Sequence, residues 1–232
     1  MKLIITRPLD DALPLARKLE ERGHEPLLAP LLGIVPRGDA MVPDARFQAI
    51  CVTSANGLQR PDVFHGLHRL PLYCVGPQSA EAARKAGFSD VRERGGNVEG
   101  LCAAISTELD STRGPLLYAS GNETSGDLEG SLTRSGFKVH RTVVYDAVKV
   151  PLSLTRDELL GADGVLLYSP RSARLWVEAL AAVTGERKAP LMHFCLSQNV
   201  ARALSPDSRF CVAEQADEAH MMTLLDRASE QE

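Results

Sequence analysis

Residues 1–29, MKLIITRPLDDALPLARKLEERGHEPLLA, contain one complete strand–helix–strand unit and so indicate the class of fold. The apolar run at residues 3–6 predicts a short strand. The spacing of leucine and alanine that follows predicts an amphipathic helix capped by Asp10 or Asp11, and a second strand is expected at residues 26–29. This order of elements is typical of a parallel sheet whose faces are covered by helices.

The same unit recurs at residues 116–145, where an apolar strand and a polar turn precede a helix and a second strand. The copies are arranged in a permuted order. The middle copy is read without interruption from residue 47 to residue 145, whereas the outer copy begins near residue 162 and is completed by residues 1–29. The other matching pairs of segments are 47–57 with 162–172, 72–80 with 192–201, and 91–105 with 211–225.

The permuted repeat predicts an α/β fold of two similar domains, each a parallel sheet flanked by helices in the flavodoxin or Rossmann manner. A discontinuous domain is expected from residues 1–33 plus 150–232, with a second domain, residues 38–144, inserted into it. The connecting segments 34–37 and 145–149 have the composition of strands, so we expect a two-stranded crossover. Chance similarity is the alternative, since all α/β units resemble one another.

Composition argues against several classes of protein. The chain has 232 residues, of which 44% are hydrophobic and 24% charged, as in ordinary globular proteins. A formal net charge of −4 gives no basic field, so we expect no nucleic-acid partner. The apolar runs have the length of strands, so we expect no membrane span, and the first residues predict a strand rather than a signal peptide.

The sequence lacks the usual motifs for metals, nucleotides and covalent catalysis. Its five cysteines form no C-x-x-C pair and suit buried thiols in a reducing cytoplasm, where we expect the protein to reside. Its six histidines have no zinc-binding spacing. Neither a phosphate-binding loop, nor a dinucleotide fingerprint, nor a G-x-S-x-G elbow occurs, so we expect no metal and no cofactor.

Short polar turns follow six of the expected strands. In a parallel sheet the carboxyl ends of the strands meet at one edge, where helix N-termini present free N–H groups. A single turn of this kind is more often only a helix cap, but six together favour an anion that carries several carboxylates. The candidate binding residues in these turns are Arg7, Thr53, Ser54, Asn56, Ser79, Ser169, Ser172, Ser197 and Asn199.

Tyr145 is the candidate proton donor. It is expected to close the last strand of the inserted domain, where the chain passes to the other domain. A phenol can donate a proton to a leaving hydroxyl group or orient an intermediate. The alternative is an amphipathic tyrosine that only packs at the domain boundary.

Taken together, these motifs resemble those of uroporphyrinogen-III synthases over essentially the whole chain. One departure is residues 195–199, Cys-Leu-Ser-Gln-Asn, where the family more often has a glycine followed by hydroxyl residues. The motifs that carry the resemblance are Thr6-Arg7-Pro8, Thr53-Ser54-Ala55-Asn56-Gly57, Val75-Gly76 before Ser79-Ala80, Leu117-Tyr118 with Gly121-Asn122, Val144-Tyr145, and Tyr168-Ser169-Pro170 with Ser172-Ala173.

The resemblance implies a cofactor-free hydro-lyase of haem biosynthesis. Its substrate would be hydroxymethylbilane, a linear tetrapyrrole rich in carboxylates, which it would cyclise with loss of water and inversion of ring D through azafulvene and spiro intermediates. Tyr145 would be the acid or the orienting phenol, and we expect a monomer. The binding hydroxyls would be Ser79, Ser169, Ser172 and Ser197, with Arg7, Thr53, Ser54 and Asn56 beside them.

Two other classes of protein compete with this interpretation. A donor-lined cleft between α/β lobes also suits a non-catalytic binding protein or sensor for an anionic small molecule. A Rossmann-type oxidoreductase is the third possibility, and the missing glycine fingerprint weakens it. Formation of the type III isomer from hydroxymethylbilane would distinguish the enzyme from both.

Overall fold

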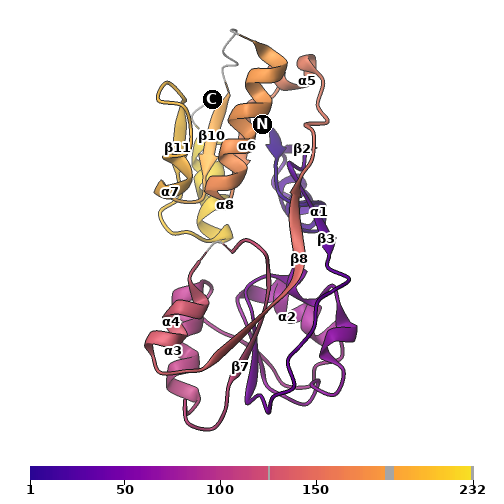
Figure 1. Cartoon of the computed structure of the whole chain (residues 1–232). Helices are drawn as coiled ribbons and strands as arrows, with labels where there is room; N and C mark the ends of the chain where they lie inside the picture. The colour runs from indigo at the N-terminus through magenta and orange to yellow at the C-terminus, as the bar shows by residue number, and fades with distance from the viewer. Residues whose placement is uncertain (125, 186–190, 231–232) are drawn as a thin grey trace. The chain divides into compact units, whose positions relative to one another are not determined.

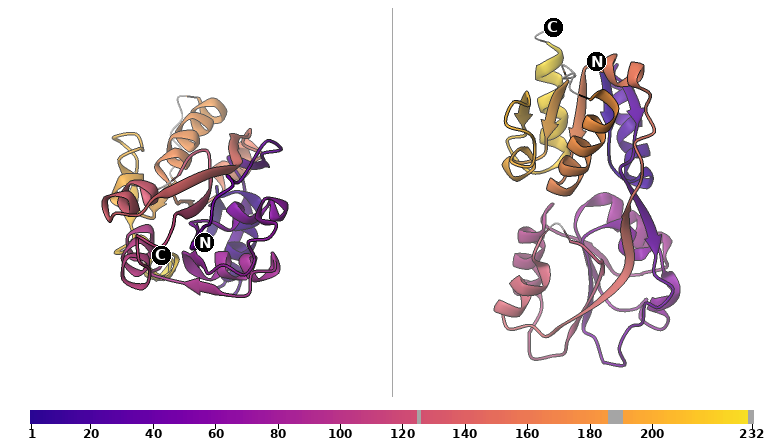
Figure 2. Two further views of the ribbon diagram at one scale, coloured as in Figure 1. Left: turned by 60° about the horizontal axis from the view of Figure 1, so that its bottom comes forward. Right: turned by 45° about the horizontal axis from the view of Figure 1, so that its top comes forward.

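The computed structural model describes residues 1–124, 126–185 and 191–230. The chain forms two compact units. Unit 1 comprises Met1–Gly33 and Val148–Glu232, and unit 2 comprises Ile34–Ala147. Each unit is built on its own sheet (Figures 1 and 2).

Unit 1 contains a five-stranded sheet in the order β11-β10-β9-β1-β2. Every neighbouring pair in it is parallel, so all five carboxyl ends lie at one edge. The alternation of side chains places Leu3 and Ile5 on one face and Ile4 on the other, all fully buried. The strands are β1 (Lys2–Ile5), β2 (Glu25–Leu28), β9 (Gly164–Leu167), β10 (Met192–Cys195) and β11 (Phe210–Val212).

Helices cover both faces of the unit 1 sheet. Residues of α1 and α8 pack against Leu3 and Ile5, whereas Trp176 of α6 packs against the face that carries Ile4. The helices are α1 (Leu9–Glu20), α5 (Arg156–Leu160), α6 (Pro170–Thr184), α7 (Gln198–Ala201) and α8 (Glu218–Ser229).

The expected cap of the first helix is wrong. Helix α1 begins at Leu9 with Pro8 as its N-cap, because the Pro8 carbonyl accepts the first helical hydrogen bond from the Ala12 N–H at 2.9 Å. Asp10 and Asp11 lie inside the first turn instead. At that place their negative charges interact favourably with the helix dipole and stabilise the helix.

The sheet of unit 2 has six strands in the order β3-β8-β7-β4-β5-β6, and only residues 32–33 of β3 and 148–149 of β8 belong to unit 1. Strands β8, β7, β4, β5 and β6 run parallel to one another. Strand β3 runs antiparallel to β8, since hydrogen bonds join Leu31 to Val150 and Arg37 to Val144. The strands are β3 (Leu32–Pro36), β4 (Ala49–Val52), β5 (Leu72–Cys74), β6 (Val91–Glu93), β7 (Leu116–Gly121) and β8 (Val139–Lys149).

Helices also cover both faces of the unit 2 sheet. Helices α3 and α4 lie together on one face (Figure 1), where Leu101 and Leu132 pack with Tyr118. On the other face, Leu58 of η1 and Ala80 of α2 join one apolar cluster. These elements are the 3-10 helices η1 (Ala55–Leu58) and η2 (Pro61–Phe64) and the helices α2 (Gly76–Lys85), α3 (Val98–Glu108) and α4 (Leu128–Arg134).

The two sheets share one topology. When β9, β10, β11, β1 and β2 of unit 1 are matched in turn with β4, β5, β6, β7 and β8 of unit 2, the spatial order of the strands is the same. The pairs of matching strands are those that the permuted repeat predicts, whereas the order of the strands in space was not predicted. The predicted fold class, two similar α/β units with parallel sheets flanked by helices, is confirmed.

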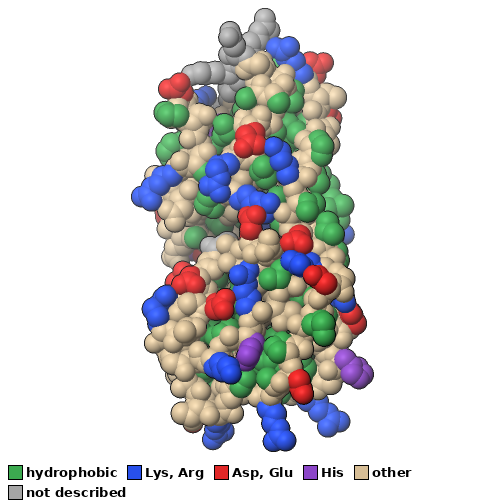
Figure 3. Space-filling model, in the orientation of Figure 1, with side chains coloured by type: hydrophobic (Ala, Val, Ile, Leu, Met, Phe, Trp, Pro, Cys, Tyr) green, Lys and Arg blue, Asp and Glu red, His purple; other side chains and the backbone are tan. Residues whose placement is uncertain are grey.

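Charges of both signs are interspersed on the face of each unit that the space-filling view shows (Figure 3). That face therefore carries no extended basic patch of the kind that binds a nucleic-acid backbone. Among the described residues, no helix is long and apolar enough to cross a membrane.

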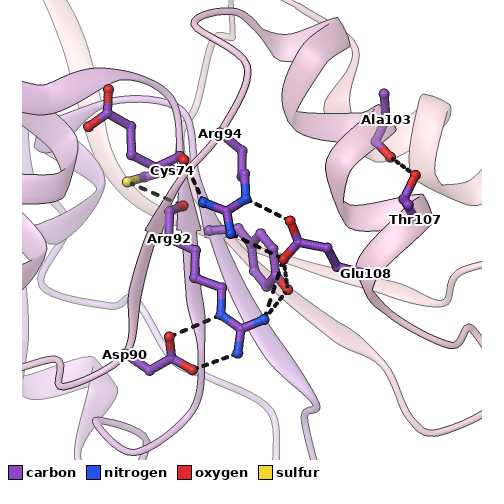
Figure 4. Close-up of polar contacts among 9 residues, drawn as sticks. Cys74, Asp90, Arg92, Arg94, Ala103, Thr107 and Glu108 are labelled. Atoms are coloured by element: carbon purple, nitrogen blue, oxygen red, sulfur yellow. Dashed lines mark hydrogen bonds and ion pairs between the residues drawn. The ribbon is translucent and has the colours of Figure 1, made fainter.

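Edge strand β6 of unit 2 carries a polar network (Figure 4). Arg92 makes two hydrogen bonds to Asp90, at 3.0 and 2.8 Å, and its guanidinium also donates to the Tyr73 hydroxyl at 2.7 Å. Glu108 of α3 accepts from Arg94 at 2.6 Å and from Tyr73 at 3.0 Å. The network ties α3 to the sheet and places charged side chains on the edge, which discourages pairing with another strand.

Candidate functional site

Each sheet has one place where the order of the strands reverses. Ligands of open α/β sheets bind at the carboxyl ends of the two strands beside such a reversal. In unit 1 the reversal lies between β9 and β1, and in unit 2 it lies between β4 and β7. These two places are the candidate functional sites, and each is described within its own unit.

At the reversal of unit 1, Arg7 follows β1 and Tyr168 follows β9. The Arg7 guanidinium carbon lies 4.6 Å from the centre of the Tyr168 ring, a cation–π contact. The same guanidinium forms ion pairs with Glu218 at 3.2 Å and with Asp11 at 3.4 Å, and Lys18 also binds Glu218. The charge of Arg7 is therefore compensated by two carboxylates of its own unit.

Burial shifts the pKa values of two groups in this cluster. It raises the pKa of the Asp11 carboxyl, an effect that the neighbouring Arg7 opposes. It also raises the pKa of the Tyr168 phenol well above its usual value. The Tyr168 hydroxyl is buried and has no hydrogen-bond partner among the described residues. Both groups therefore favour their neutral, protonated forms more than they would in water.

Ser169 and Ser172 form the capping box of α6. The Ser172 N–H donates to the Ser169 Oγ at 3.0 Å, and the Ser169 N–H donates to the Ser172 Oγ at 3.1 Å. Both predicted binding hydroxyls thus also cap the helix. After β10, Ser197 is the N-cap of α7 but makes no capping bond with its side chain, and the Asn199 amide oxygen accepts from Arg202 at 3.0 Å.

At the reversal of unit 2, Thr53 follows β4 and its hydroxyl lies 3.2 Å from the hydroxyl of Tyr118 on β7. Burial raises the pKa of the Tyr118 phenol. The Ser54 Oγ accepts from the Asn56 N–H at 3.2 Å, and the Asn56 amide oxygen accepts from Gln59 at 3.0 Å. The helix expected after this turn is only the short 3-10 helix η1, so it supplies little dipole for an anion.

Ser79 lies one strand further from the reversal. It is buried in the first turn of α2, the helix that follows β5. The turn before it is shorter than the sequence pattern predicts, because Gly76 with its φ of 74° already begins α2. The Ser79 hydroxyl therefore belongs to the helix rather than to a loop.

Tyr145 lies on β8, opposite Gly121 of β7 and next to an irregularity in the ladder at Ser120 and Gly121. A Cβ atom on Gly121 would lie 2.6 Å from two carbons of the Tyr145 ring and 2.9 Å from its hydroxyl oxygen. The Asn122 N–H donates to the Tyr145 carbonyl at 3.0 Å. The sequence pattern predicted that Tyr145 ends this strand. That prediction is wrong, because β8 continues to Lys149.

Sequence reasoning missed three residues at these reversals. Tyr168 was named only within a motif and was not proposed as a site residue. Its position directly before a polar turn at a strand end was a signal that could have identified it. The role of Gly121 depends on a contact with a residue 24 positions away in the sequence. Arg141 gave no local signal at all, since it lies inside a strand. In the described parts of the chain, no group of three potential ligands could hold a metal ion.

These features define a class of protein: an α/β protein of two doubly wound units whose strand ends present hydroxyl, amide and helix N-terminal donors. Comparison with known proteins identifies the family. The family model described as uroporphyrinogen-III synthase HemD matches residues 14–225. A uroporphyrinogen-III synthase from Chlorobaculum parvum is 30% identical over 197 residues, which cover 78% of this chain and 79% of the relative. The chain belongs to the uroporphyrinogen-III synthase family.

Solved structures share the fold. The uroporphyrinogen-III synthetase of Helicobacter pylori matches with a TM-score of 0.64 and 15% identity, covering 98% of this chain and 99% of that one. A mutant uroporphyrinogen III synthase of Thermus thermophilus matches with a TM-score of 0.54 and 17% identity over the whole of both chains. Family membership makes the chain a cyclising enzyme of haem biosynthesis and does not favour a non-catalytic binding protein.

Proposed function

We propose that this chain converts hydroxymethylbilane into uroporphyrinogen III. The hydroxyl group of the linear tetrapyrrole leaves as water, which yields an electrophilic azafulvene. The substituted position of ring D attacks it to form a spiro intermediate, which fragments and closes again with ring D inverted. Because unassisted closure yields the symmetric type I isomer, the enzyme has chiefly to hold one conformation of the chain.

The match of the family model over residues 14–225 carries this proposal. The geometry of the strand ends supports it. A substrate with many carboxylates needs many donors, and the carboxyl edges of both sheets present serine, threonine and asparagine side chains, with the N-terminus of the long helix α6 among them in unit 1. The proposed binding residues are Arg7, Thr53, Ser54, Asn56, Ser79, Ser169, Ser172, Ser197 and Asn199.

Tyr145 is the proposed acid. Its phenol would donate a proton to the leaving hydroxyl group, or orient the azafulvene that remains. Two neighbouring features support this role. Its ring is packed against Gly121, which limits its motion, and its carbonyl is bonded to the Asn122 N–H. A phenol held in one place suits a step in which geometry decides which isomer forms.

A cytoplasmic monomer completes the proposal. All five cysteines, Cys51, Cys74, Cys102, Cys195 and Cys211, are free thiols, which agrees with a reducing compartment. Burial raises the pKa of Cys74 to about 11, so this thiol stays protonated and unreactive at neutral pH. Size-exclusion chromatography with light scattering would test the monomer.

The direct test of the proposal is an isomer assay. The purified protein is supplied with freshly made hydroxymethylbilane, the products are oxidised, and the porphyrin isomers are separated by chromatography. We expect the type III isomer in clear excess over a control without enzyme. A product mixture that contains only the type I isomer would refute the proposed activity.

A further inference from the structure

The Arg141 side chain binds the carboxyl end of strand β7. Its Nε donates to the Ser120 Oγ at 2.8 Å, and its Nη2 donates to the carbonyl oxygens of Gly121 and Asn122, both at 2.7 Å. The Ser120 hydroxyl in turn donates to the Gly121 carbonyl at 2.9 Å. Hydrogen bonds from a charged donor are about twice as strong as neutral ones. One guanidinium therefore fixes three consecutive residues.

These three residues need such a contact because the sheet supports them on one side only. The ladder between β4 and β7 ends where Val52 pairs with Ala119. Beyond that point β7 pairs only with β8, and the register there is interrupted between Ser120 and Gly121. Backbone with fewer supporting hydrogen bonds opens at a lower free energy than the middle of a sheet. Arg141, from the neighbouring strand, supplies the missing bonds.

The segment that Arg141 holds is also the segment that Tyr145 contacts. The Tyr145 ring packs on Gly121, where an added Cβ would lie 2.6 Å from the ring, and the Asn122 N–H binds the Tyr145 carbonyl at 3.0 Å. Arg141 binds the carbonyl groups of these same two residues. A shift of this segment would therefore move the phenol with it.

The bonding of Arg141 differs from that of Arg7 at the reversal of unit 1. Arg7 is paired with the carboxylates of Asp11 and Glu218. In the part of the chain that the structure describes, no carboxylate forms an ion pair with Arg141, and its three acceptors are a hydroxyl and two carbonyl oxygens. The guanidinium thus binds only the segment 120–122, through one side-chain hydroxyl and two backbone carbonyl groups of the described residues.

We propose that Arg141 is a positioning residue for Tyr145: it holds residues 120–122 so that the phenol keeps the place from which it acts. The inference rests on the proposed role of Tyr145 in the synthase reaction. Arg141 itself does not touch the reacting atoms. Its loss lets the end of β7 move, and a displacement of about 1 Å at a reacting group lowers the rate roughly 100-fold.

A double-mutant cycle tests this inference. Type III formation is measured for the wild type, Arg141→Met, Tyr145→Phe and the double variant. We expect Arg141→Met to lower kcat by about 10- to 100-fold in the wild-type background, with KM nearly unchanged. In the Tyr145→Phe background the same substitution should change kcat by less than about 2-fold, since a residue that acts through the phenol has nothing left to position.

Two further variants complete the design. Arg113→Met removes an equally charged, exposed residue from the loop before β7 and should leave kcat unchanged. Arg141→Lys should recover part of the rate, because an ammonium can reach some of the same oxygens. If circular dichroism shows that Arg141→Met is not folded, the double-mutant cycle with Tyr145→Phe is measured with Arg141→Lys and with Ser120→Ala instead.

The outcomes separate this inference from the proposed function. A wild-type protein that forms only the type I isomer overturns both. If the wild type is active, equal losses of kcat from Arg141→Met in both backgrounds overturn the positioning role. So does a rise in KM without a loss of kcat, which would show that Arg141 binds the substrate instead. The positioning role is also overturned if Arg141→Met, or Tyr145→Phe, has the kcat of the wild type.

Discussion

Replacing Gly121 by alanine would place a methyl group in the space that the Tyr145 ring occupies. The added Cβ would lie 2.6 Å from the ring atoms Cε2 and Cζ and 2.9 Å from the hydroxyl oxygen, whereas ordinary contacts are 3.4–4 Å. The ring must therefore move by about 1 Å, which is the displacement that costs roughly 100-fold in rate at a reacting group. Gly121→Ala should lower kcat by about that factor if Tyr145 acts in catalysis.

The protein should remain folded. Overpacking of this kind costs about 1–3 kcal/mol, and alanine recovers about 0.5–1 kcal/mol over glycine inside a strand. The net loss is smaller than the stability of an ordinary domain, about 5–15 kcal/mol. A substantial fall in kcat with an intact unfolding transition would thus point to a displaced phenol rather than to a damaged fold.

The assay combines steady-state formation of the type III isomer with urea unfolding followed by circular dichroism. Gly38→Ala is the matched control, because a Cβ atom there meets nothing within 4 Å and its φ is not in the left-handed region. If Gly121→Ala keeps the kcat of the wild type, the position of the Tyr145 phenol does not matter for catalysis and the prediction is wrong. An equal loss of kcat when Gly121→Ala is made in the Tyr145→Phe background would also refute it.

Three further predictions follow from single groups. Tyr145→Phe should lower kcat by about 100-fold or more while the protein stays folded by circular dichroism, and an unchanged kcat would remove the phenol from the mechanism. Tyr168→Phe should raise the free energy of unfolding by about 1 kcal/mol in a urea titration, because it removes a buried hydroxyl that lacks a hydrogen-bond partner among the described residues. A lower free energy of unfolding would show that this hydroxyl is hydrogen-bonded. Asp217 caps α8, and the hydrogen bond from the His220 N–H lowers the pKa of its carboxyl group. The stabilisation by this cap is therefore complete above the ordinary carboxyl pKa of 3.8, and it is lost as the pH falls through the lowered pKa. Asp217→Ala should therefore cost about 1 kcal/mol at neutral pH, and a cost that persists in strong acid would contradict the role of the carboxylate.

The class of fold could be predicted because buried strands and helix faces produce apolar patterns that can be recognised within short stretches of sequence. The run Leu3, Ile4 and Ile5 is apolar without interruption because both faces of its strand are covered, and that pattern is readable without any structure. The repeat of such units in permuted order was readable as well, since each unit is contiguous in the chain. Local capping was harder to predict: Pro8 rather than Asp10 or Asp11 caps the first helix.

The candidate site was predictable only as a set of positions at strand ends. Helix N-termini and polar turns are local features, so Ser169, Thr53 and Ser197 could be named in advance. The sequence could not show that Arg7 would be paired with Glu218, which is 211 positions away. That contact depends on β1 and the N-terminus of α8 reaching the same edge of one sheet.

The amino-acid sequence was therefore sufficient to predict the repeated strand–helix units and the polar residues at the strand ends. Which strand ends are neighbours could be learned only from the folded protein. That order sets the reversal between β4 and β7, places Tyr145 against Gly121 and brings Arg141 onto the end of β7. The physical reason is that burial and capping depend on nearby residues, whereas the neighbours of a strand depend on pairing between segments that are distant in the chain.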